Sequence, residues 1–332
     1  MKFSRPLRML LWPASLLYGA VVTTRTALYT RGFFKRKRLK SPVISVGNLT
    51  VGGTGKTPLV IWLADRLLQQ GKRVGILSRG YRGTAGTSDE IELIKSRLQN
   101  RVSFGVGKNR FIEGTKIESH EPVDVFLLDD GFQHLQLARD LDIVLMDASR
   151  PVGPGILPSG PMRERASALS RAGVIVFTRT ENAFGAHEAI QRLSNLPVFA
   201  ASTTLLGFRS LNTSGSLRPV SGSTDGPFFA FCGIGNPEAF ICDLKRWGID
   251  PAGHTFFRDH HRYTLEDAGT IEKSAQRAGA KAVVTTEKDS FNLKAAKFSM
   301  PVYVAVIDLH IANEMQFLAT VENAIQARGV LA

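Results

Sequence analysis

The stretch Thr50-Val51-Gly52-Gly53-Thr54-Gly55-Lys56-Thr57 decides the fold of this chain of 332 residues. It follows a short apolar run, residues 42–46, and precedes a helical pattern over residues 58–70. Glycines in such a loop let backbone N–H groups point inward at phosphates, and the positive end of the next helix strengthens the attraction. Lys56 is expected to reach the β- and γ-phosphates of a nucleotide and Thr57 to ligate Mg²⁺. The sequence therefore predicts a phosphate-binding loop (P-loop), although Thr50 replaces the usual first glycine.

The rest of the chain alternates apolar runs with helical stretches. Apolar runs that predict buried strands occupy residues 74–77, 123–128, 141–146 and 173–177. Near-continuous runs of this kind, separated by helices, are typical of a mostly parallel sheet that is covered on both faces. The predicted fold is therefore a doubly wound α/β domain of the P-loop NTPase type over residues 41–206.

A second, smaller α/β domain is predicted beyond the P-loop domain. Residues 207–227 are rich in Ser, Gly, Thr and Pro, which favours a linker. After it, the alternation resumes with three further strand candidates at residues 227–231, 282–285 and 301–306, and residues 233–237 open a helix. The expected organisation is a basic and apolar segment (1–40), the P-loop domain (41–206), the linker (207–227) and the smaller domain (228–332).

The net charge of +13 is concentrated at one end of the chain. Residues 1–40 carry ten Lys or Arg and no acid, whereas the rest of the chain carries 32 basic and 29 acidic residues. A basic groove for nucleic acid is therefore not predicted. The two cysteines, Cys232 and Cys242, form no CxxC pair, so neither a zinc site nor a disulfide framework is predicted, and a reducing cytoplasm is the simplest compartment.

The apolar run Met9–Val22 lies between these basic clusters. Its fourteen residues, with Pro13 among them, are fewer than the about 20 that a transmembrane helix needs. A helix that lies in the anionic membrane interface is the favoured interpretation, because basic residues flank the run on both sides. A secretory signal peptide is one alternative, although secreted compartments lack the ATP that a P-loop needs. A core-packing helix with a solvated basic tail is the other.

The second signal for phosphate chemistry is Asp129-Asp130, which follows the apolar run 126–128. Carboxylates at the end of a strand lie at the carboxyl edge of a parallel sheet, where the P-loop also lies. There they could hold Mg²⁺ directly or through water. The alternative is an Asp-Asp-Gly turn with solvated acids.

A P-loop alone does not separate a kinase from a nucleotide switch. Val51 occupies the place where a membrane-partitioning ATPase carries its signature lysine, and Thr286–Asp289 approaches a guanine-binding motif with the wrong spacing. A kinase also needs a group that orients and deprotonates an acceptor hydroxyl. Asp89-Glu90 and Asp259-His260-His261 are the two candidates, and their spacing in the sequence does not bring them together.

Eight blocks in order give the chain a resemblance to the tetraacyldisaccharide 4′-kinases, which phosphorylate the lipid A precursor at the bacterial inner membrane. The resemblance runs from about residue 5 to residue 310. The blocks are residues 46–48, Ser78-Arg-Gly-Tyr81, Asp89-Glu90, Leu128-Asp-Asp-Gly-Phe-Gln-His134, Pro158-Ser-Gly-Pro-Met-Arg-Glu164, Gly233-Ile-Gly-Asn-Pro237, Asp259-His260 and Thr286-Glu-Lys-Asp289.

The resemblance implies roles for matching residues. Asp89 is expected to be the catalytic acid-base residue, with His260 as the partner that orients it and raises its basicity. Asp129, Asp130 and Glu164 are expected around Mg²⁺, with Thr57. The residues expected near the acceptor are Asn48, Arg79, Tyr81, Arg110 and Arg163. Closure of the two domains is expected to bring His260 towards Asp89 and to exclude water.

The resulting expectation is a lipid kinase at the cytoplasmic face of the bacterial inner membrane, peripherally bound. It would transfer the γ-phosphate of ATP, with Mg²⁺, to the 4′-hydroxyl of tetraacyldisaccharide 1-phosphate and give lipid IVA. The expected partners are this acylated glucosamine disaccharide phosphate and the membrane surface, with no nucleic acid and no obligate protein partner. The alternatives are a kinase for another acceptor and a membrane-bound nucleotide switch.

Overall fold

The computed structural model describes residues 5–80, 88–149, 155–180, 196–211 and 226–329, together with residues 153 and 217. The chain divides into two compact units. The first comprises Met1–Thr87, Ile94–Ser202 and Leu309–Ala332, and the second comprises Ser88–Leu93 and Thr203–Asp308. This division differs from the predicted segments. Ser88–Leu93 and residues 203–206, from the predicted P-loop domain, group with the second unit, as do the residues of the predicted linker 207–227. Leu309–Ala332, from the predicted smaller domain, returns to the first unit.

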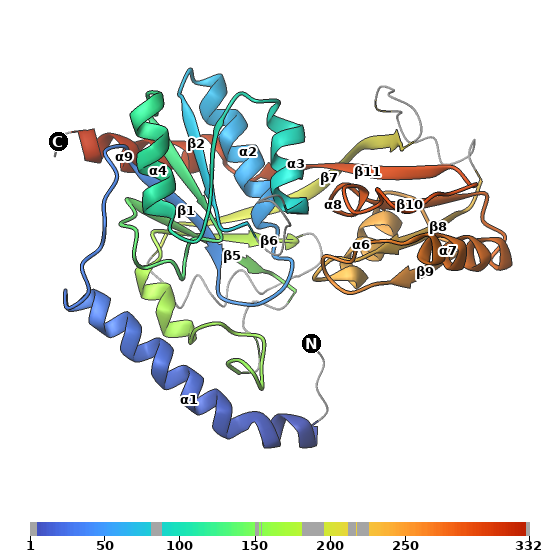
Figure 1. Ribbon diagram of the computed structural model, residues 1–332, viewed down its shortest axis with the longest axis horizontal. Coiled ribbons are helices and arrows are strands. Elements are labelled where there is room, and N and C mark those ends of the chain that lie inside the picture. Colours follow the sequence, from blue (N-terminus) through green and yellow to red (C-terminus); the bar gives the residue numbers. More distant parts are fainter. Residues whose placement is uncertain are drawn as a thin grey trace. The chain divides into compact units, whose positions relative to one another are not determined.

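The first unit is built on a parallel sheet (Figure 1). Its strands run in the order β3 (Ser103–Val106), β2 (Val74–Ser78), β4 (Val125–Asp129), β1 (Val43–Asn48), β5 (Leu141–Asp147), β6 (Val174–Thr178) and β7 (Val198–Ser210). The five predicted strands of this domain are confirmed. The sequence analysis missed β3, which is only four residues long, and β7, whose residues alternate between buried and partly exposed positions.

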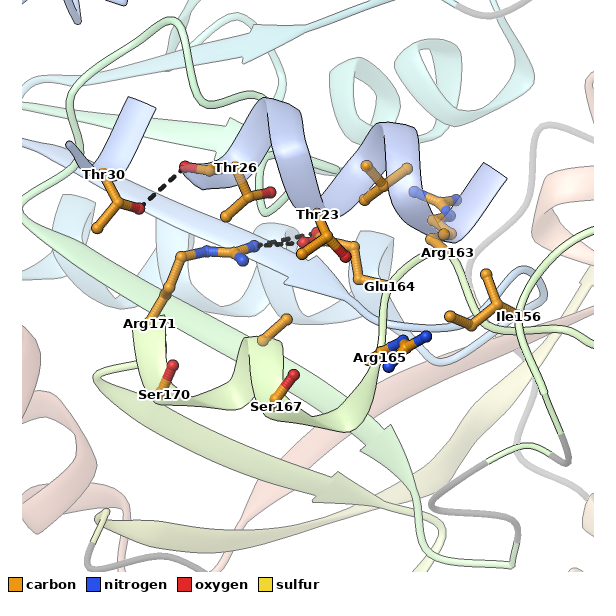
Figure 2. A pocket seen from close by; sticks show the side chains of 13 residues that line it. Thr23, Thr26, Thr30, Ile156, Arg163, Glu164, Arg165, Ser167, Ser170 and Arg171 are labelled. Atoms are coloured by element: carbon orange, nitrogen blue, oxygen red, sulfur yellow. Dashed lines mark hydrogen bonds and ion pairs between the residues drawn. The ribbon is translucent and has the colours of Figure 1, made fainter. Parts of the chain in front are cut away.

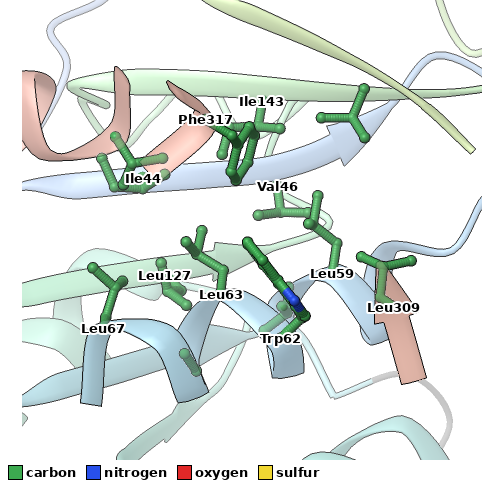
Figure 3. Close-up of a cluster of buried hydrophobic side chains, with 14 of the residues drawn as sticks. Ile44, Val46, Leu59, Trp62, Leu63, Leu67, Leu127, Ile143, Leu309 and Phe317 are labelled. Carbon is green, nitrogen blue, oxygen red and sulfur yellow. The ribbon is translucent and has the colours of Figure 1, made fainter. Parts of the chain in front are cut away.

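Alternate residues of these strands pack against helices on opposite faces of the sheet. On one face, Ile44 and Val46 of β1 join a core with α2 (Lys56–Gln69), the C-terminal half of α3 (Asp89–Leu98) and α9 (Glu314–Gly329), as Figure 3 shows for α2 and Phe317. On the other face, Val43 packs with α4 (Arg110–His120), and β5 and β6 pack with the 3₁₀ helix η2 (Ala166–Arg171). The predicted doubly wound arrangement is confirmed, because strands with period two that are buried on both sides require it.

The second unit repeats this plan on a smaller scale. Its parallel strands run in the order β11 (Val302–Ile311), β10 (Ala282–Thr286), β8 (Phe228–Cys232) and β9 (Gly253–Phe256), and β7 and β11 each continue from one unit into the other. α6 (Pro237–Arg246) covers one face and α7 (Leu265–Arg277) the other, while the short α8 (Glu287–Ser290) follows β10 directly. The predicted strands β8, β10 and β11 are confirmed, whereas β9 was missed.

The N-terminal segment forms one long helix, α1 (Arg5–Thr30), which continues through Pro13. The helix is longer than the apolar run Met9–Val22, because it begins four residues before the run and ends eight residues after it. By length and composition alone, the part Pro6–Thr30 is long and apolar enough to cross a membrane, a property that signal sequences share. Only 11% of its most apolar window is buried, which excludes the alternative of a core-packing helix.

Candidate active site

The P-loop begins where β1 ends, in the middle of the first unit's sheet. Gly52 (φ 129°) and Gly55 (φ 82°) adopt positive φ values that glycine accepts without strain, and α2 starts at Lys56. The side chain of Asn48 is fully buried and donates a hydrogen bond to Thr54 Oγ1 at 2.8 Å. Thr178 Oγ1 donates to the carbonyl oxygen of Thr54 at 3.1 Å. Asn48, which was expected near the acceptor, therefore stabilises the P-loop through its hydrogen bond to Thr54.

The carboxylates after β4 lie beside this loop because β1 and β4 are adjacent and parallel, with Val46 in register with Asp129. Asp129 is buried and accepts a hydrogen bond from Ser78 Oγ at 3.3 Å. Asp130 lies 3.5 Å from Lys56 Nζ and accepts from Arg163 Nη1 at 2.8 Å. Burial opposes ionisation of Asp130, but the positive charges of Lys56 and Arg163 outweigh it and lower the pKa of its carboxyl group. An anionic carboxylate thus faces the P-loop lysine.

The segment that carries Arg163 and Glu164 is fixed against the start of the P-loop. Val51 N donates to the carbonyl oxygen of Pro161 at 2.8 Å, and Arg163 N donates to that of Leu49 at 2.7 Å. Arg163 points to Asp130, whereas Glu164 is buried and paired with Arg171 at 2.9 Å. The structure therefore brings Arg163, Asp130 and Lys56 together and engages Glu164 elsewhere.

Glu164 and Arg171 line a cavity of about 200 Å³ between α1 and η2 (Figure 2). The hydroxyl side chains Thr23, Thr26 and Thr30 of α1 lie on one side of it. Arg163 and Arg165 also line it, and the Glu164–Arg171 ion pair crosses it. Sequence reasoning missed this cavity, because it joins residues near position 25 to residues near position 165. Its lining suits a polar, anionic group next to the apolar helix α1.

Arg79 and Arg110 also lie near the Asp129-Asp130 pair. Arg110 is buried, and both this burial and the positive charge of Arg79 lower the pKa of its guanidinium group. Burial, followed by the charges of Arg110 and Arg139, lowers the pKa of His134 to about 4, so this imidazole is neutral at pH 7. The expected acceptor residues Arg79 and Arg110 are thus close enough to interact. Tyr81 lies outside the described residues.

Asp89 and His260 meet within the second unit, although 171 residues separate them in the sequence. His260 Nδ1 lies 2.9 Å from both carboxylate oxygens of Asp89. The side chain of Asp89 is 3% exposed and that of His260 is 25% exposed. His260 has a φ of 61°, a left-handed conformation that costs energy for a residue other than glycine and is often found at functional sites. The expectation that domain closure brings the two together was wrong, because Ser88–Leu93 packs with the unit that carries His260.

The contact shifts the titration of both groups. Burial opposes ionisation of Asp89, but the hydrogen bond from His260 and the positive charge of Lys288 outweigh it and lower the pKa of the Asp89 carboxyl group. For His260, the hydrogen bond to Asp89 is the largest effect and raises the pKa of the imidazole, while burial and Lys288 oppose it. The pair therefore combines a firmly ionised carboxylate with an imidazole that is more basic than usual.

A metal ion at this site would need ligands from the nucleotide as well as from the protein. Among the described residues, no group of three or more His, Cys, Asp or Glu could hold a metal ion. The hydroxyl of Thr57 and the carboxylates after β4 are oxygen donors of the kind that Mg²⁺ prefers, and Mg²⁺ usually keeps only one or two carboxylates besides substrate phosphates. The donor set therefore fits a nucleotide-bound Mg²⁺.

Comparison with known proteins covers nearly the whole chain. The family model for tetraacyldisaccharide-1-P 4′-kinase (LpxK) matches residues 7–326. The tetraacyldisaccharide 4′-kinase of Geobacter metallireducens is 37% identical over 319 residues, covering 90% of this chain and 93% of the relative. That of Geobacter sulfurreducens is 38% identical over 318 residues, covering 90% and 87%.

Among solved structures, LpxK from Aquifex aeolicus in complex with ATP is 30% identical, with a TM-score of 0.75, and the match covers 96% of this chain and 99% of that one. The match of both sequence and fold over nearly the full length accounts for the P-loop unit, the smaller unit and the N-terminal helix together. This chain belongs to the tetraacyldisaccharide-1-P 4′-kinase (LpxK) family.

Proposed function

We propose that this chain transfers the γ-phosphate of ATP to the 4′-hydroxyl of tetraacyldisaccharide 1-phosphate in lipid A biosynthesis, and that His260 is the base. The observation that carries the proposal is the 2.9 Å contact between His260 and Asp89 in a chain that also has a P-loop. A nucleotide switch has no need of a paired imidazole and carboxylate, whereas transfer to an alcohol needs a group that removes the hydroxyl proton.

The assignment of His260 as the base exchanges the roles that the resemblance implied. Asp89 is almost fully enclosed, and the lowered pKa of its carboxyl group makes it a weak base. Its carboxylate can only accept hydrogen bonds, so the proton of neutral His260 resides on Nδ1 and the lone pair on Nε2. Nε2 would then take the proton of the acceptor hydroxyl, while Asp89 stabilises the imidazolium that results.

The first unit would supply phosphate binding and charge neutralisation. Lys56 and the backbone N–H groups of the P-loop are placed to hold the β- and γ-phosphates. We assign Mg²⁺ to the hydroxyl of Thr57 and the carboxylate of Asp129, because Asp130 is already paired with Lys56 and Arg163. When bound, Mg²⁺ would neutralise charge on the phosphates. Glu164 is a weaker candidate for this role, since Arg171 holds it in the cavity beneath α1.

The proposed reaction is tested by transfer of labelled γ-phosphate from ATP to tetraacyldisaccharide 1-phosphate in detergent micelles. We expect label on the lipid with Mg²⁺ and a loss of at least about 100-fold when EDTA removes the metal, because the metal offsets charge in the transition state. Restored transfer after excess Mg²⁺ is the control. Bound ATP without labelled lipid would contradict the proposal, and slow ATP hydrolysis stimulated only by a protein would favour a switch.

We further propose that α1 holds the protein on the cytoplasmic face of the bacterial inner membrane. Large apolar side chains of α1 are exposed, among them Leu10 (76%), Trp12 (60%) and Leu17 (69%). Contact between this face and lipid would remove apolar surface from water, and the basic residues around the helix would favour anionic head groups. The cavity beneath α1 would then meet the polar part of an acceptor that stays in the bilayer.

Replacing Leu10, Trp12 and Leu17 with serine is expected to reduce binding to anionic phospholipid vesicles by at least about tenfold, because three apolar side chains lose their burial. Vesicle sedimentation measures this. The matched control replaces Leu265 and Met315, which are exposed apolar residues outside α1, with serine. Equal sedimentation of the α1 variant and the native protein would rule out α1 as the membrane contact.

A further inference from the structure

The segment Thr286–Asn292, of which the sequence analysis singled out Thr286–Asp289 without a function, lies against the Asp89–His260 pair. Asp289 is fully buried and accepts hydrogen bonds from Gly233 N at 2.9 Å and Tyr263 Oη at 3.0 Å. Gly233 in turn accepts from His260 N at 3.1 Å through its carbonyl oxygen. The backbone of His260 is thus tied to the same buried carboxylate that anchors the start of α8.

Asn292, just beyond α8, reaches the reactive pair itself. Its Nδ2 lies 3.1 Å from Asp89 Oδ2, across 203 residues of sequence. Backbone hydrogen bonds hold Asn292 in place, because its N–H donates to the carbonyl oxygen of Asp289 at 2.8 Å and its own carbonyl oxygen accepts from Tyr263 N at 3.2 Å. An ionised carboxylate only accepts hydrogen bonds, so the amide must present its NH₂ group. Asn292 and His260 therefore clamp Asp89 from two directions.

Charged groups complete the surroundings of the pair. Lys288 on α8 lies 3.0 Å from Asp259 and 3.4 Å from Glu90, the neighbours of His260 and Asp89 in sequence. Among the described residues, the charged groups that act on His260 are Lys288, Asp89 and Asp259, and Glu90 pairs with Lys288. Burial opposes the charge of Lys288, but these carboxylates raise the pKa of its ammonium group. Lys288 is a fixed cation, whereas Asn292 is the neutral donor that touches Asp89.

We propose that Asn292 is a positioning residue for the phosphoryl transfer, which fixes the Asp89 carboxylate so that the carboxylate in turn orients the imidazole of His260. The inference rests on the proposed role of the Asp89–His260 pair. The Asp89 carboxylate has two donors besides Asn292: the N–H of Glu90 donates to Oδ1 at 2.9 Å, and His260 Nδ1 lies 2.9 Å from both oxygens. Asn292 adds a donor on Oδ2 that comes from neither neighbour, and without it Oδ2 can shift as the carboxylate turns about its Cβ–Cγ bond, which changes the orientation of the imidazole. The hydrogen bond from the amide of Asn292 to Oδ2 fixes the plane of the carboxylate. The fixed carboxylate then determines the direction of the hydrogen bond from His260 Nδ1–H and so the orientation of the imidazole. At metal sites, loss of a hydrogen-bond partner that orients a ligating imidazole typically lowers metal affinity or activity by about 10- to 100-fold.

The experiment compares Asn292→Leu and Asn292→Asp with Ser290→Ala in the full-length protein, in the micelle assay with labelled ATP and tetraacyldisaccharide 1-phosphate. Ser290 is the matched control, because its hydroxyl bonds to Glu287 on the same helix and not to Asp89. We expect Asn292→Leu to lower kcat by about 10- to 100-fold without a change in KM for ATP. Ser290→Ala should remain within about twofold of the native rate, since the bond that it removes is local to α8.

Asn292→Asp separates positioning from a general loss of structure. It keeps the shape of the side chain but places a second negative charge beside Asp89. This charge should raise the pKa of His260 further and move the acid limb of the kcat profile to higher pH by about one unit. A defect in folding alone would lower kcat without moving this limb. If Asn292→Leu does not fold, the pH profile of Asn292→Asp decides.

Native rates in both Asn292 variants, or reduced rates with an unmoved acid limb in Asn292→Asp, would overturn the inference. Asp89→Ala in the same assay separates this failure from a failure of the proposed function. If Asp89→Ala abolishes transfer and both Asn292 variants have native rates, the positioning role of Asn292 is wrong and the proposed function stands. If Asp89→Ala itself remains active, the proposed reaction chemistry fails.

Discussion

Replacing His260 with alanine is expected to lower kcat for lipid phosphorylation by about 10²- to 10⁴-fold, the usual contribution of a positioned general base. The KM for ATP should change little, because the P-loop belongs to the other unit of the chain. The measurement is steady-state transfer of labelled γ-phosphate to the lipid acceptor. His261→Ala is the matched control, since the neighbouring imidazole contacts Asp267 at 3.0 Å and not Asp89. Near-native turnover of His260→Ala would remove His260 from the mechanism.

The pH dependence of the transfer rate is a second test of His260 as the base. A base works in its neutral form, so activity should rise with pH through the raised pKa of His260. In Asp89→Asn the negative charge is gone and the amide oxygen can offer His260 only a weaker, neutral hydrogen bond, while burial and Lys288 still lower the pKa of the imidazole. The acid limb should therefore move to lower pH as the maximal rate falls. If the acid limb of the pH–rate profile is the same in Asp89→Asn as in the native protein, a group other than His260 controls the activity in this pH range.

Replacing Lys56 with alanine should lower kcat/KM for ATP by about 10²- to 10³-fold, the typical cost of losing one preorganised donor to transition-state charge. In the structure Lys56 Nζ lies 3.5 Å from Asp130, at the start of α2. The ammonium group is thus held at the P-loop and is placed to reach the β- and γ-phosphates. Transfer kinetics over a range of ATP concentrations measure the effect.

Arg66→Ala is the control for Lys56→Ala, because Arg66 lies on the same helix and pairs at 2.6 Å with Glu314 on α9. Its loss removes partly exposed ion pairs with Glu314 and Asp65 and a contact with the ring of Trp62, each of which is worth at most about 1 kcal/mol. Equal losses in the two variants would indicate that damage to α2, and not loss of phosphate binding, explains the effect of Lys56→Ala.

Local sequence determined the parts of this protein that depend on neighbouring residues. Glycines that accept positive φ, followed at once by a helix, predicted the P-loop. Apolar runs of five to seven residues predicted β1, β4 and β5, because strands buried on both faces need such runs. The Asp129-Asp130 pair was predicted at the edge of the sheet for the same reason: adjacent parallel strands end at the same edge, and Val46 is indeed in register with Asp129. The short β3 and the half-exposed β7 lacked such a signal.

Contacts between distant residues were decided by the tertiary structure alone. The sequence named Asp89 and His260 but could not pair them, and it assigned them to different domains; the packing of Ser88–Leu93 with the second unit brings them within 2.9 Å. Asn292 gave no signal, since a single asparagine after a short helix has no periodicity or motif. The burial of Asp89 is also the observation from which we propose that His260, and not Asp89, is the base. The sequence by itself determined the P-loop fold and the candidate residues, whereas burial and hydrogen bonds across 171 and 203 residues decided which of them act together, because those depend on how the whole chain packs.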